Sequence, residues 1–66
     1  MNYGEALKEQ RELAGLSVME LAKKLSTSHQ NITRWERGDV IPSIDFCVKL
    51  ADCYGISLDE LIGRKI

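Results

Sequence analysis

The chain has 66 residues, of which 44% are hydrophobic and 29% are charged, and its formal net charge is −1. This composition is typical of a globular protein and excludes a disordered chain, and the length predicts a single domain over residues 1–66. No apolar run approaches the ~18 residues of a membrane span and the N-terminus lacks a signal-peptide pattern, so we expect a cytoplasmic protein without membrane contact.

A first helix is predicted at about 3–14. Its start follows from a capping pair, Asn2 with Glu5 three residues later, and its end from Gly15, a common helix terminator. The residues expected to face the core are Leu7, Leu13 and Ala14.

A second helix is predicted from the cap Ser17 to near Ser26, because Ser17 and Glu20 repeat the capping pattern. Its apolar face comprises Val18, Leu21, Ala22 and Leu25.

The third predicted helix follows after a very short turn, begins at the cap Ser28 and is closed by Gly38. Two short helices joined in this way form a helix-turn-helix. Ile32 and Trp35 lie three residues apart on one side and predict a buried seam. The other side is polar and carries His29, Gln30, Thr33, Arg34 and Arg37. Such side chains can hydrogen-bond a base edge or a phosphate, so the pattern predicts a DNA recognition helix.

Two more helices complete an all-α chain. The fourth begins at Ser43 and stops at Gly55, and the fifth begins at Ser57, whose capping partner is Glu60. The apolar residues expected to face the core are Ile44, Cys47, Leu50, Ala51 and Tyr54 in the fourth helix, with Leu58, Leu61 and Ile62 in the fifth.

The positive charge is concentrated around the helix-turn-helix. Between Lys23 and Arg37 there are four basic residues and one acidic residue, a local balance of +3 in a chain whose total is −1. This distribution favours an anionic partner for the third helix, although a short basic segment can also be a solvated face.

The two cysteines, Cys47 and Cys53, are six residues apart on one predicted helix. That separation is ~9 Å along a helix axis, which is too far for a disulfide. With a single histidine in the chain, a structural zinc site is also not expected. We interpret both cysteines as small apolar fillers in a reducing compartment.

The chain resembles the phage-repressor-like (Cro/repressor, XRE type) helix-turn-helix DNA-binding domains. The residues that carry the resemblance are, in order, Arg11, Gly15-Leu16-Ser17, Glu20-Leu21-Ala22, Ile32-Thr33-Arg34-Trp35-Glu36-Arg37-Gly38, Pro42-Ser43-Ile44, Leu50-Ala51 and Gly55-Ile56-Ser57-Leu58-Asp59-Glu60-Leu61. The resemblance implies a lambda-repressor-like, compact five-helix bundle that inserts its third helix (28–37) into the major groove. It also implies a transcriptional repressor that binds a palindromic operator as a homodimer.

By position, the resemblance assigns base contacts to His29, Gln30, Thr33 and Arg34. Phosphate contacts are expected from Ser17, Ser28, Asn31 and Arg37. The resemblance also implies that Glu36 pairs with Arg11, which would tie the third helix to the first.

Two positions depart from the family pattern. Val18 stands where the family commonly has a glutamine that reaches the DNA backbone, and Asp39 stands where a basic residue is frequent. Both departures weaken the expected phosphate anchoring. They support an alternative function, in which the same scaffold is a protein-interaction module such as an antirepressor or antitoxin-like partner.

An exposed apolar patch formed by Phe46, Ile62 and Ile66 is a candidate dimer interface, with incomplete burial inside one monomer as the alternative for Phe46. An enzyme is not expected, because the only histidine, His29, lies on the predicted DNA face and no nucleophile-base-acid set or glycine-rich phosphate loop is present. We therefore predict double-stranded DNA as the partner and no cofactor, metal or small-molecule ligand.

Overall fold

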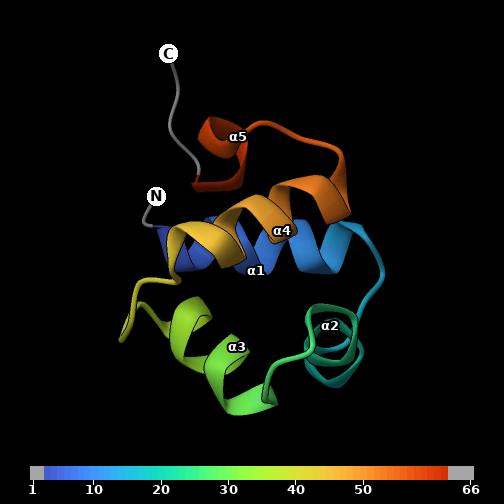
Figure 1. Ribbon diagram of the computed structural model, residues 1–66, viewed down its shortest axis with the longest axis vertical. Helices are drawn as coiled ribbons and strands as arrows, with labels where there is room; N and C mark the ends of the chain where they lie inside the picture. The colour runs from blue at the N-terminus through green and yellow to red at the C-terminus, as the bar shows by residue number, and fades with distance from the viewer. Residues whose placement is uncertain (1–2, 63–66) are drawn as a thin grey trace.

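The structure is a computed structural model that describes residues 3–62. Within this range the chain forms five helices and no strand, as predicted (Figure 1). The helices are α1 (Tyr3–Leu13), α2 (Val18–Leu25), α3 (His29–Arg37), α4 (Ile44–Tyr54) and α5 (Leu58–Ile62). The first helix ends one residue earlier than expected, and its predicted cap Asn2 lies outside the described residues. No helix in the described range has the length and apolarity needed to cross a bilayer.

The helices surround one core. Helices α1 and α4 cross the middle of the molecule, α2 and α3 lie on one side of them, and α5 lies on the other (Figure 1). Helix α1 packs against α3 and α5, and α2 packs against α3 and α4. Every helix contributes to the buried cluster, which consists of Leu7, Leu21, Ala22, Leu25, Ile32, Trp35, Leu50, Ala51 and Leu61. Full burial of one Leu or Ile side chain stabilises the fold by about 1.5–3 kcal/mol, so this shared cluster holds the short helices together.

Several residues predicted to face the core are instead exposed. Leu13 is 74% exposed, Ile44 is 79% exposed and Leu58 is 47% exposed. Each is the first or last residue of its helix, where the neighbouring helices no longer cover it. Ala14, just beyond α1, is exposed for the same reason. Ile62 closes α5 and is 39% exposed. Helical periodicity correctly indicates which side of a helix faces inward, but it does not indicate how far the packing partner extends.

The predicted caps set most of the helix boundaries. Ser17 forms the full capping box: its Oγ accepts from the Glu20 amide at 3.1 Å, and Glu20 Oε1 accepts from the Ser17 amide at 2.9 Å. Helix α2, however, ends without a glycine. Its C-cap, Ser26, adopts the left-handed conformation with φ 55° and donates its amide to the carbonyls of Ala22 and Lys23. A non-glycine residue in this conformation lowers the stability of the fold by roughly 1–2 kcal/mol. Ser26 adopts it at the start of the short turn between α2 and α3.

A glycine inside α1 sets how closely α1 approaches α3. A Cβ on Gly4 would lie 2.5 Å from the carbonyl oxygen of Glu36 and 3.0 Å from the amide nitrogen of Gly38. Both are backbone atoms at the C-terminal end of α3, so they cannot move aside as a flexible side chain would. Gly4 therefore allows the N-terminus of α1 to hold the end of α3 in place.

Candidate nucleic-acid interface

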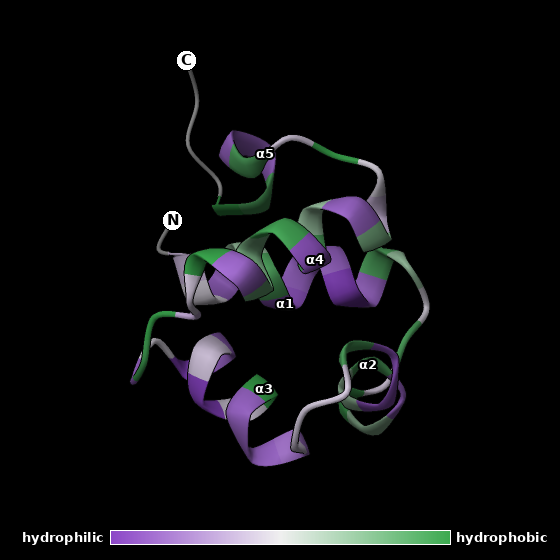
Figure 2. Ribbon diagram, viewed as in Figure 1, coloured by the Kyte–Doolittle hydropathy of each residue, from purple (hydrophilic) through white to green (hydrophobic). Residues whose placement is uncertain are grey.

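Helix α3 has one buried and one exposed face. Ile32 is 1% exposed and Trp35 is 5% exposed, so these two side chains anchor the helix in the core as predicted. The opposite face is polar (Figure 2) and exposes His29, Gln30, Thr33, Arg34 and Arg37. The four predicted base-contacting residues thus lie together on the outer face of one rigidly anchored helix, and their contacts with bases stay a prediction.

The hydroxyl of Thr33 is committed to the helix itself. Its Oγ1 donates a hydrogen bond to the carbonyl oxygen of His29 at 3.1 Å. Because the only hydroxyl proton is used in this way, Thr33 retains its methyl group and its acceptor lone pairs for a partner. This fits the methyl contact with thymine that the residue type suggests.

The predicted phosphate-contacting residues at the start of α3 also have local structural roles. Ser28 Oγ caps the helix by accepting from the Asn31 amide at 3.3 Å. The side-chain amide of Asn31 donates to Thr27 Oγ1 at 2.9 Å, which ties α3 to the turn that precedes it. One Asn31 amide proton and its carbonyl oxygen remain for other partners. Phosphate contact by Ser17, Ser28 and Asn31 stays a prediction.

Arg37 and Asp39 form an exposed ion pair at the end of α3. Arg37 Nε lies 3.4 Å from Asp39 Oδ2, and the two side chains are 70% and 52% exposed. An exposed pair of this kind contributes at most about 1 kcal/mol and is screened by salt. Arg37 is therefore accessible to an anion, but Asp39 competes for its charge, which agrees with the weakening predicted from Asp39.

The pair implied between Arg11 and Glu36 is present and nearly buried. Arg11 Nε donates to Glu36 Oε2 at 2.7 Å and Nη2 donates to Oε1 at 3.0 Å, while Nη1 donates to the carbonyl of Leu16 at 2.9 Å. The two side chains are only 11% and 9% exposed. The hydrogen bonds that Arg11 donates to the Glu36 carboxylate raise the pKa of Arg11 above its usual value. This bridge ties α3 to α1 and turns the only carboxylate of α3 away from the polar face.

Phe46 packs inside the monomer rather than standing free. It is half-buried, its ring centroid lies 5.0 Å from that of Trp35, and the Lys49 ammonium lies 5.2 Å above the Phe46 ring. These contacts cover part of the Phe46 side chain, and its role in a dimer interface stays a prediction. Of the other two predicted interface residues, Ile62 is 39% exposed and Ile66 lies outside the described residues.

A different apolar surface was missed by the sequence analysis. Ile41, Ile44 and Val48 are 74%, 79% and 43% exposed, and they occupy the loop before α4 and its first turns. Ile44 and Val48 are four residues apart and therefore share one helix face. The exposure of Ile41 could have been predicted, because Val40 and Ile41 are adjacent apolar residues in a loop.

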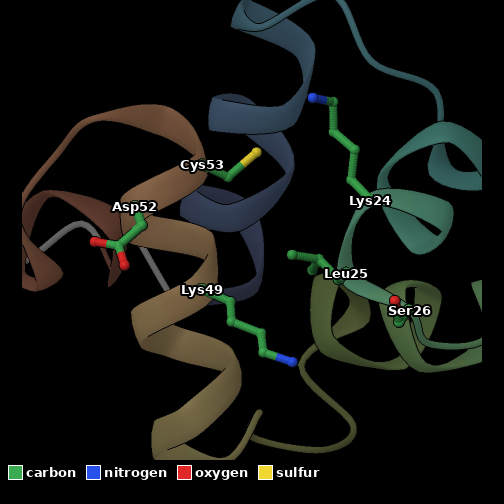
Figure 3. A pocket seen from close by; sticks show the side chains of 6 residues that line it. All are labelled: Lys24, Leu25, Ser26, Lys49, Asp52 and Cys53. Atoms are coloured by element: carbon green, nitrogen blue, oxygen red, sulfur yellow. The ribbon is translucent and has the colours of Figure 1, made fainter.

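A hollow of about 400 Å³ lies between α2 and α4 (Figure 3). Cys53 and the two lysine side chains face it, whereas Asp52 turns away. Its lining residues are Lys24, Leu25, Ser26, Lys49, Asp52 and Cys53. Cys53 is exposed, so its interpretation as a small apolar filler was wrong, while Cys47 is partly buried. Across residues 3–62, no group of His, Cys, Asp and Glu is arranged to hold a metal ion.

A second hollow, of about 270 Å³, lies beside the polar face of α3 where α1, α2 and α3 meet. Its lining residues are Lys8, Arg11, Val18, Thr33, Glu36 and Arg37. Lys8 was not singled out by the sequence analysis, because nothing in the local pattern of α1 indicates that it lies beside α3.

A family model described as helix-turn-helix matches residues 7–61. The chain is 38% identical, over 97% of its length, to the HTH-type transcriptional regulator ImmR of Bacillus subtilis. It is 33% identical, again over 97% of its length, to the cryptic phage CTXphi transcriptional repressor RstR of Vibrio cholerae. The chain spans 50% of the length of ImmR and 57% of the length of RstR.

Among solved structures, the chain is similar to the P22 c2 repressor in a complex with a synthetic operator. The TM-score is 0.89 and the match covers 98% of both chains at 23% identity, which establishes a common fold.

Proposed function

Because the chain belongs to the phage-repressor-like (XRE type) helix-turn-helix family, we propose that it is a sequence-specific DNA-binding transcriptional repressor. The relatives named above are transcriptional regulators rather than enzymes. P22 c2, which shares the fold, binds an operator. We propose that the chain is a single domain and that α3 enters the major groove of DNA. The two free cysteines agree with the reducing cytoplasm as its compartment.

One observation carries this proposal: α3 exposes a polar face without a carboxylate, on a helix that is fixed at several points. Ile32 and Trp35 hold it in the core, and the Arg11 bridge removes Glu36 from the exposed face. A helix that is held in place can discriminate between bases because its backbone does not have to be ordered on binding.

Each of the four predicted base-contacting residues has a chemical match among the bases. Arg34 can donate two hydrogen bonds to guanine O6 and N7, and Gln30 can pair with adenine N6 and N7. His29 can donate to a guanine acceptor, and the Thr33 methyl can pack on a thymine methyl.

A matched pair of arginine variants tests the proposal. Arg34→Ala should lower affinity for a selected site by about 1–3 kcal/mol and relax the preference at one base position. Arg37→Ala, on the same helix, should weaken binding to all sequences alike, because a phosphate contact carries no base preference. Randomised-oligonucleotide selection followed by fluorescence anisotropy would measure both. An Arg34→Ala variant with unchanged affinity and preference would refute the base-reading role.

We further propose that the repressor binds as a homodimer on an inverted repeat. A dimer would place its two α3 helices in successive major grooves about 34 Å apart. The exposed Ile44 and Val48 face of α4, together with Ile62, is the surface we assign to the dimer, because burial of exposed apolar area drives association. Sedimentation should show Ile44→Asp as a monomer at a concentration where the wild type is dimeric. Leu13→Asp, at a similarly exposed aliphatic residue at the end of α1, is the matched control and should leave the dimer intact.

The protein-interaction module remains the second candidate, because the Arg37–Asp39 pair and the net charge of −1 both disfavour DNA. Salt titration separates the two functions. A DNA-binding protein loses affinity linearly in log salt, with a slope of about −0.9 per phosphate neutralised. A protein module without DNA affinity would show no binding to titrate.

A further inference from the structure

The hollow at the junction of α1, α2 and α3 lies at the edge of the predicted DNA-reading face. Thr33 belongs to that face and also lines the hollow, while Lys8 lines it from α1 and Val18 from the start of α2. A DNA backbone that runs past α3 would therefore pass this hollow.

The charges around the hollow leave it positive. Arg11 and Glu36 neutralise each other through two short hydrogen bonds and are almost fully buried. The remaining charged lining residues are Lys8 and Arg37, both exposed cations. Lys8 enters none of the ion pairs found within residues 3–62, and Arg37 has only its exposed contact with Asp39.

The wall formed by α2 supplies no charge of its own. Val18 presents an apolar side chain at the position where the hollow meets α2. An anion in the hollow would therefore be held by Lys8 from one side and by Arg37 from the other. A lysine ammonium suits this role because it is a compact point charge on a flexible stem, which can follow a phosphate without a fixed bidentate geometry.

We propose that this hollow receives one phosphate of the DNA backbone, and that Lys8 supplies the contact that Val18 cannot make. The inference rests on the proposed DNA-binding function and adds to it a residue of α1 that lies outside the helix-turn-helix. Asp39 opposes the contact by competing for Arg37.

Lys8→Gln tests the assignment, with Lys49→Gln as the matched control. Both substitutions remove one exposed lysine charge, but Lys49 lies on α4 at the other hollow. Affinity for a selected site and for unrelated DNA would be measured over a salt series, with circular dichroism to verify the fold. We expect Lys8→Gln to weaken binding to both DNAs by the same factor and to make the log–log slope shallower by about 0.9. The ratio of wild-type to Lys8→Gln affinity should then shrink about 3.5-fold between about 50 and about 200 mM salt.

Each outcome bears on a definite claim. If the wild type and Lys49→Gln bind DNA and Lys8→Gln binds with the same affinity and slope, the phosphate site is wrong and the DNA-binding function stands. If the wild type shows no DNA binding, both are wrong. Inorganic phosphate, compared with chloride at equal ionic strength, tests for a free anion. Phosphate that lowers the DNA affinity of the wild type more than that of Lys8→Gln would support a site in the hollow that a DNA phosphate occupies. Phosphate that binds through Lys8 without changing DNA affinity would assign the hollow to a free anion and overturn its assignment to DNA.

Discussion

Substitution of Glu36 by glutamine keeps the size of the side chain and removes its charge, and we expect it to lower the free energy of unfolding by about 2–4 kcal/mol. Breaking a fully buried pair costs about 3–5 kcal/mol, because the remaining charge loses its partner without regaining water. The Arg11 and Glu36 side chains are 11% and 9% exposed, and a glutamine oxygen can still accept one of the two bonds from Arg11. The expected cost is therefore somewhat below the fully buried value.

This loss is large for a domain of 66 residues. At roughly 0.05–0.15 kcal/mol per residue, the whole fold is stable by only about 3–10 kcal/mol. For a domain of this size 1 kcal/mol corresponds to about 4–8 °C in Tm, so Glu36→Gln should lower Tm by about 10–30 °C.

Urea and thermal unfolding would measure the effect, with the fluorescence of the single, buried Trp35 as the signal. Glu9→Gln, at an exposed carboxylate of α1, is the control and should change stability by less than about 0.5 kcal/mol. A double replacement, Arg11→Met with Glu36→Leu, should be more stable than Glu36→Gln, because it leaves no uncompensated buried charge. If Glu36→Gln unfolded at the same urea concentration as the wild type, the bridge would contribute nothing and the reasoning would fail.

Three other substitutions test the packing of the fold. Gly4→Ala should lower the free energy of unfolding by about 1–3 kcal/mol in urea, because its methyl group would lie 2.5 Å from the carbonyl oxygen of Glu36; an unchanged midpoint would show that α1 can retreat from α3 without cost. Ser26→Gly should raise the free energy of unfolding by up to about 1 kcal/mol by relieving the left-handed backbone at φ 55°, and a loss measured in the same assay would contradict the strain. Burial raises the pKa of Tyr54 to about 12, whereas an exposed tyrosine ionises near pH 10. The unfolded chain therefore releases this proton first, and wild-type stability should fall by up to about 2–3 kcal/mol as pH rises from about 10 to about 12. Tyr54→Phe should lack this loss in urea titrations at pH 7 and in that alkaline range, and an identical pH dependence in both proteins would refute the assignment.

The local sequence determined where most helices begin and end. The serine caps at residues 17, 28 and 43 each accept a backbone hydrogen bond three residues later, and Gly38 and Gly55 close their helices in the left-handed conformation. Such signals act within a few residues of the chain, so they can be read without knowledge of the fold. For the same reason, the buried and exposed faces of α3 could be predicted from the spacing of Ile32 and Trp35.

Tertiary structure decided what the helices do to one another. The sequence pattern placed Leu13 and Ile44 on the inner faces of their helices, but the ends of the neighbouring helices leave both exposed. Nothing local to Gly4 indicates that the backbone of α3 lies against it.

The candidate site divides along the same line. The polar residues of α3 could be predicted because they follow one another on a single helix. The partners Arg11 and Glu36, 25 positions apart, came from family resemblance rather than from periodicity. The hollow lined by Lys8 could be found only in the folded structure, because three helices from separate parts of the chain form it. Capping and periodicity are interactions between near neighbours in sequence, whereas a site built between helices depends on distances that only the packed core sets.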